Sequence, residues 1–104
     1  MIFRRKRFAD VIRRQLDLFE RDHADLYAQI AAAERAYDDA EREEAEERYG
    51  EYVDLVEEGT EALADIRDSF KRTLDEAADE EYDEAFNRAV RKRFPRFGTE
   101  IDLR

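Results

Sequence analysis

The chain has 104 residues, no cysteine, three glycines and one proline, and its formal net charge is −10. The absence of cysteine excludes disulfides, thiolate metal sites and cysteine nucleophiles, and the scarcity of turn residues argues against a sheet-rich fold. No apolar run approaches the ~20 residues of a transmembrane helix, and the basic N-terminus lacks the apolar segment of a signal peptide. We therefore expect one all-α, cytoplasmic domain over residues 1–104.

The first predicted element is a long helix over about residues 8–37. Apolar or aromatic residues recur there at alternating steps of four and three, which is the spacing of a heptad repeat. Only one member of this first seam, His23, is polar. The first seam consists of Ile12, Leu16, Phe19, His23, Leu26, Ile30, Ala33, Tyr37 and Ala40.

A second seam with the same steps runs from Ala45 to Ala77 and predicts a helix over about residues 40–77. The two seams differ in phase by one residue, which fits either a turn near residues 42–43 or a skip inside one long helix. Their similar lengths favour an antiparallel helical hairpin, with Gly50 as the alternative position of the turn.

A shorter third helix is predicted over about residues 79–94, with Asp79 as its N-cap. Pro95 should end it, since proline disfavours helix at the preceding residue. The tail, residues 95–104, carries apolar residues that can pack back on the bundle. Because a hairpin with so few large apolar residues leaves one side open, we expect a homodimer.

The only histidine lies in the pattern Glu20-x-x-His23. This spacing resembles that of ferritin-like di-metal proteins, in which glutamate and Glu-x-x-His ligands project into a helical bundle. The resemblance implies an iron or manganese site that two copies would complete. Glutamates beside the second seam are candidates for the remaining ligands: Glu57 and Glu61.

A structural role for His23 is the interpretation that we favour, since the second seam offers no carboxylate at an inward position. In a hairpin, His23 would lie opposite Gly59 and Thr60. Gly59 would leave room for the imidazole, and the Thr60 hydroxyl could bond one ring nitrogen, as a buried polar group requires. We therefore expect no metal, no cofactor and no catalytic residue.

Charge is segregated along the chain. Residues 1–14 carry a net charge of +5, residues 88–104 a net +4, and residues 15–87 a net −19. Residues 2–14 could anchor the chain at an anionic membrane surface, whereas the overall negative charge disfavours nucleic acid. We favour pairing of the basic ends with the acidic segment 75–84 inside the fold. The candidate interaction residues are Arg4, Arg5, Lys6, Arg7, Arg91, Lys92 and Arg93.

No P-loop, dinucleotide fingerprint, nucleophile elbow or zinc spacing occurs in the sequence. The pattern therefore favours a non-enzymatic helical interaction or scaffold protein that self-associates through its seams. A dimeric ferritin-like metal-binding protein and a peripheral membrane adaptor are the alternatives.

Overall fold

The computed structural model describes residues 7–104, which form five α-helices and no strand. The all-α prediction is therefore confirmed for this part of the chain. The helices are α2 (Ala9–Asp22), α3 (Ala24–Asp38), α4 (Ala45–Lys71), α5 (Glu76–Arg93) and α6 (Pro95–Ile101).

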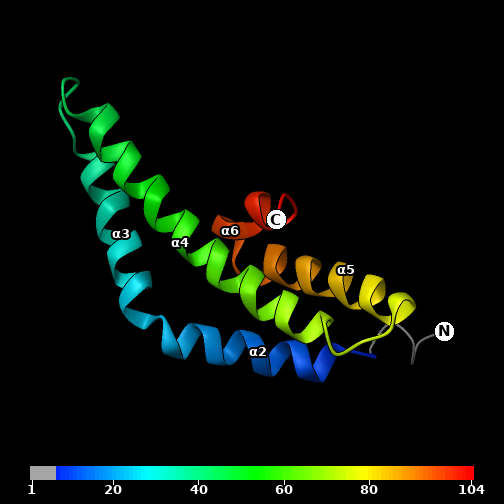
Figure 1. Ribbon diagram of the computed structural model, residues 1–104. Coiled ribbons are helices and arrows are strands. Elements are labelled where there is room, and N and C mark those ends of the chain that lie inside the picture. Colours follow the sequence, from blue (N-terminus) through cyan, green and yellow to red (C-terminus); the bar gives the residue numbers. More distant parts are fainter. Residues whose placement is uncertain (1–6) are drawn as a thin grey trace.

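The molecule is elongated, with principal extents of 53 × 23 × 23 Å. At one end, α3 lies beside the first half of α4, and no other helix of residues 7–104 accompanies this pair (Figure 1). At the other end, α2 and α5 lie along the second half of α4, and α6 packs near its middle. The long helix α4 therefore belongs both to a two-helix projection and to a compact body.

The link between α3 and α4 comprises residues 39–44. The backbone N–H of Asp39 donates to Arg35 O at 2.9 Å, which closes the last turn of α3. Gly50 lies inside α4, so this alternative position for the turn is wrong. The predicted range 40–77 for the second helix was too long at both ends, because charged residues with good helix propensity flank α4 without forming part of it.

The predicted first helix is interrupted at His23, so its continuous range of 8–37 is wrong. His23 has φ −117° and ψ 29°, outside the helical region, and separates α2 from α3. Its backbone N–H still donates to Phe19 O at 2.9 Å. The break gives α2 and α3 different directions (Figure 1). As a result, α2 packs against α5 while α3 packs against α4.

The third helix begins three residues earlier than predicted. Asp75 is its N-cap and accepts a hydrogen bond from Ala78 N at 2.9 Å, whereas Asp79 lies inside the first turn. The helix ends at Arg93, and Pro95 is the first residue of α6. This position suits proline because the first N–H groups of a helix have no partner within it. The tail thus forms a short helix that packs on α4 and α5.

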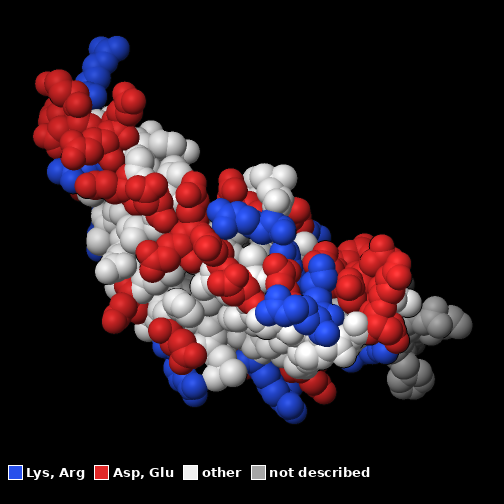
Figure 2. All heavy atoms as spheres, viewed as in Figure 1, with Lys and Arg blue, Asp and Glu red and all other residues white. Residues whose placement is uncertain are grey.

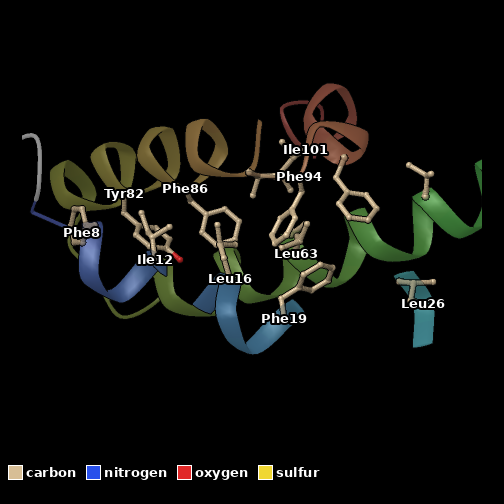
Figure 3. Packing of buried hydrophobic residues seen from close by; sticks show 14 of the residues in the cluster. Phe8, Ile12, Leu16, Phe19, Leu26, Leu63, Tyr82, Phe86, Phe94 and Ile101 are labelled. Atoms are coloured by element: carbon tan, nitrogen blue, oxygen red, sulfur yellow. The ribbon is translucent and has the colours of Figure 1, made fainter. Parts of the chain in front are cut away.

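The core lies in the body, between α2, α4, α5 and α6 (Figure 3). Burial of its apolar surface is the main favourable contribution to folding. The helices α5 and α6 pack against α4 and so cover part of the surface that two helices alone would leave open. The largest fully buried apolar side chains are Tyr82, Phe19, Phe86, Phe97, Leu16, Ile30, Leu63, Ile101 and Val90.

Candidate functional site

His23 lies half-buried at the junction of α2 and α3. Its ring stacks on Phe19 with 4.7 Å between centroids, and Nδ1 lies 3.1 Å from Phe19 O. The partners that the sequence suggested are engaged elsewhere. The Thr60 hydroxyl donates to Val56 O at 2.8 Å, and the space at Gly59 is filled by a phenylalanine of α6. The assignment of Gly59 and Thr60 to His23 was therefore wrong.

The four candidate metal ligands are not brought together within one chain. The Glu20 carboxylate accepts a hydrogen bond from Arg93 Nη2 at 2.6 Å. Glu57 and Glu61 are exposed on α4, and Glu61 lies 3.9 Å from the guanidinium of Arg104. Among residues 7–104 there is no group of three histidine or carboxylate side chains that could hold a metal ion.

Of the N-terminal basic residues, Arg4, Arg5 and Lys6 lie outside the described residues. Arg7 lies 3.5 Å from Glu81 of α5. Phe8 and Ile12, two apolar residues of the suggested membrane anchor, are buried in the core. None of the helices within residues 7–104 has the length and apolar character that a membrane span requires.

Two of the three candidates at the end of α5 make ion pairs within the chain. Arg93 lies 2.7 Å from Asp17 and 2.6 Å from Glu20, and so connects α5 to α2. The hydrogen bond to Glu20 raises the pKa of Arg93 above its ordinary value. Arg91 pairs with Asp102 at 2.6 Å.

The third candidate, Lys92, lines a groove of about 650 Å³ between α2 and α5. We call this depression the basic groove. Its floor is apolar and consists of Ala9, Ile12, Leu16, Ala85 and Ala89. Its cationic lining residues are Arg13, Arg88, Lys92 and Arg93.

The opposite end of the molecule is strongly acidic. Residues 37–58, which we call the acidic arm, include the end of α3, the link and the first half of α4. They contain eleven acidic and two basic side chains, a net charge of −9, and all eleven acidic residues are exposed. Figure 2 shows acidic side chains covering this end of the molecule. The net charge of the arm, −9, is therefore nearly as large as that of the whole chain, −10.

A cluster of three tyrosines lies on the acidic arm. The rings of Tyr37 and Tyr49 are 5.3 Å apart, and those of Tyr49 and Tyr52 are 6.4 Å apart. Tyr37 is 41% and Tyr49 51% exposed, which places them among the most exposed large hydrophobic residues of the described chain. Of the three, only Tyr52 is partly buried. The arm thus combines exposed aromatic rings with a high density of carboxylates.

Sequence reasoning missed a buried polar cluster around Arg67, which is only 2% exposed. Its Nη1 donates to Asn87 Oδ1 at 2.9 Å and to Ile101 O at 3.1 Å, and its Nε donates to Asp68 at 2.9 Å. Asp83 lies 3.3 Å from the same Nε. The cluster joins α4, α5 and the end of α6. The one asparagine of the chain was the sequence feature that could have pointed to it.

No family model, curated protein or solved structure matches this chain.

Proposed function

We propose that this chain is a non-enzymatic helical interaction protein that forms a homodimer and uses its acidic arm to bind basic protein surfaces. The observation that carries the proposal is the set of eleven exposed carboxylates within residues 37–58. Clustered charge of one sign accelerates encounter with a surface of opposite sign and rejects surfaces of the same sign. A basic partner fits this arm, and nucleic acid does not.

The tyrosine cluster supports the same partner chemistry. Exposed aromatic rings provide apolar contact area and attract arginine or lysine groups through cation–π contacts. Tyr37 and Tyr49 present such rings beside the exposed carboxylates of the arm. Carboxylates supply long-range attraction and the rings supply short-range contact, so an arginine-rich surface satisfies both.

The direct test measures binding of a fluorescent oligo-arginine peptide by anisotropy. The arm variant Glu46→Gln/Glu47→Gln should weaken binding, because it removes two exposed charges from the first turn of α4. The control variant Glu76→Gln/Glu80→Gln changes net charge equally on α5, outside the arm, and should bind like the wild type. Equal losses in both variants would show that total charge, and not the arm, attracts the peptide.

The aromatic contribution needs its own variant. Tyr37→Ser/Tyr49→Ser leaves every carboxylate in place and should weaken binding by about tenfold, since two cation–π contacts at exposed sites contribute about 0.5–1 kcal/mol each. This loss should persist at high salt, where the electrostatic part of binding is screened. Unchanged binding by the tyrosine variant would reduce the proposal to a purely electrostatic surface.

A further inference from the structure

We infer that the acidic arm of one copy docks into the basic groove of a second copy, and that the contact is made twice in the homodimer. This inference rests on the proposed function, because it assigns the basic surface that the arm binds. The inference rests on two complementary surfaces of the same chain. The arm is acidic and has exposed tyrosines, and the groove has an apolar floor and cationic lining residues.

The groove has the chemistry that the arm requires. Arg93 is held by Asp17 and Glu20 of α2, but two other cations are less strongly engaged. Arg13 lies 3.1 Å from Asp10 and Arg88 3.6 Å from Glu84, each on its own helix. Exposed pairs of this kind contribute ~0–1 kcal/mol, so they can exchange for carboxylates of a partner. Lys92 makes no ion pair with residues 7–104. Arg13, Arg88 and Lys92 can therefore accept new carboxylate partners at small cost.

The apolar floor needs an apolar contact as well as charge. The tyrosine rings of the arm supply it, because they are exposed and are flanked by carboxylates that would reach the cationic lining. Two acidic arms would repel each other, which disfavours a dimer built from arm against arm. The groove of a second copy is the complementary surface that this chain provides.

The positions of the two surfaces suit a closed dimer. The arm lies at one end of the 53 Å molecule, and α2 and α5, which form the groove, lie toward the other end (Figure 1). Within one chain the arm cannot reach its own groove, since the arm continues into the body as the single helix α4, whereas α2 and α5 form the groove. Two copies side by side in opposite directions bring each arm to the other groove, and this two-fold arrangement closes without extending into a filament.

The test reverses the charges of the groove or of the arm and measures the molecular mass in solution. The groove variant Arg88→Glu/Lys92→Glu and the arm variant Glu43→Lys/Glu47→Lys each place like charges in both contacts of their own homodimer. Each should weaken dimerisation at least about tenfold, which corresponds to about 1.4 kcal/mol. An equimolar mixture should restore dimers, because the mixed pair matches opposite charges at both contacts. The control Arg14→Glu/Arg21→Glu has the same charge change on exposed α2 residues outside the groove and should remain dimeric.

The outcomes separate the inference from the proposed function. A wild-type chain with the mass of one molecule, or variants that dimerise like the wild type, would overturn the inference and leave arm binding to basic peptides intact. The monomeric groove variant exposes its arm fully, so its failure to bind the oligo-arginine peptide would contradict the proposed function. Circular dichroism of each variant must retain the helical signal, so that loss of dimers is not loss of folding.

Discussion

At the scale of single residues, close packing around Gly59 fixes the position of α6. A methyl group placed on Gly59 would lie 2.6 Å from Cε1 of Phe97 and 3.4 Å from Leu26. Phe97 is 1% exposed and packs against Phe19 at a ring distance of 5.9 Å. The ring therefore cannot move aside without displacing other core side chains. The glycine lets an aromatic residue of the C-terminal helix reach the surface of α4.

We expect Gly59→Ala to lower the free energy of unfolding by about 1–3 kcal/mol, the usual cost of overpacking a core. Gly50→Ala is the matched control on the same helix, because nothing lies within 4 Å of its new methyl group. This control should gain about 0.5–1 kcal/mol from better helix propensity. Urea unfolding followed by circular dichroism measures both, and a stabilised Gly59→Ala variant would show that Phe97 is free to move.

The buried hydroxyl of Tyr82 should make the free energy of unfolding decrease at alkaline pH. It is fully buried, its hydroxyl donates to Gln15 Oε1 at 2.8 Å, and burial raises its pKa from 10.0 to about 12. Above pH 10 the unfolded chain loses this proton while the folded chain keeps it. The stabilising contribution is therefore complete below pH 10 and is lost as pH rises to 12. A pKa difference of this size corresponds to about 3 kcal/mol.

Thermal unfolding from pH 9 to 12 tests this expectation. Tyr82→Phe should lose part of the alkaline decline in melting temperature, because phenylalanine has no proton to release. Tyr49→Phe should keep the full decline, since Tyr49 is 51% exposed. Identical pH profiles for the wild type and Tyr82→Phe would mean that other groups cause the alkaline unfolding.

At the scale of helices, the cluster around Arg67 joins elements that the heptad pattern does not relate. One guanidinium bonds a side chain of α5 and the last carbonyl of α6, at 2.9 and 3.1 Å. We expect Arg67→Ala to destabilise the fold by about 3 kcal/mol, because it leaves buried acceptors without a donor. Arg72→Ala, an exposed neighbour one turn beyond, should change stability by less than about 0.5 kcal/mol.

The same cluster predicts how the loss is distributed along the chain. Without Arg67, the carbonyl of Ile101 loses its buried donor, so α6 should be the first helix to detach. Hydrogen exchange by mass spectrometry should then show faster exchange in residues 95–101 than in α2. Uniform acceleration across all helices would contradict a role in holding α6.

The sequence was sufficient for the helical class and for much of the core. Within the first seam, Ile12, Leu16 and Phe19 are buried as the spacing predicted. The interruption at His23 could not be predicted, because no helix breaker precedes it. The break follows from tertiary packing, in which α2 and α3 contact different helices. Local propensity does not contain that information.

The candidate site shows the same division. The acidic arm follows from charge counts along a continuous segment, so the sequence indicates it directly. The basic groove combines Arg13 with Arg88 and Lys92, which come together only when α2 and α5 lie side by side. Arg67 was overlooked because arginine usually lies at the surface, and its acceptors come from helices distant in sequence.

At the scale of the whole molecule, stability should fall from the body toward the arm. The body contains nearly all of the buried side chains, whereas within the acidic arm only Val56 is classed as buried. Regions with few buried contacts open locally at low free energy. We expect amides of residues 45–52 to exchange faster than those around Leu63, in the middle of the same helix.

The proposed docking makes hydrogen exchange in the arm depend on protein concentration. Dilution below the dimerisation constant should accelerate exchange in residues 45–52 and leave the centre of α4 unchanged, because the proposed docking covers the arm part of α4 and not its centre. Exchange measured at two concentrations by mass spectrometry provides this comparison. Equal protection along α4 at low concentration would contradict an autonomous, weakly stabilised arm.

The contact between Phe97 and Gly59 also marks a boundary in α4. The arm part of the helix should tolerate more substitutions during evolution than the part in the body. On the body side, substitutions must preserve shape, because each side chain fits among fixed neighbours. On the arm side, the proposed binding depends mainly on the number and sign of the exposed carboxylates. Aspartate and glutamate can therefore exchange, or shift by one position, without loss of recognition. Related chains should retain Gly59 and Phe97, whereas the residues of the arm should vary.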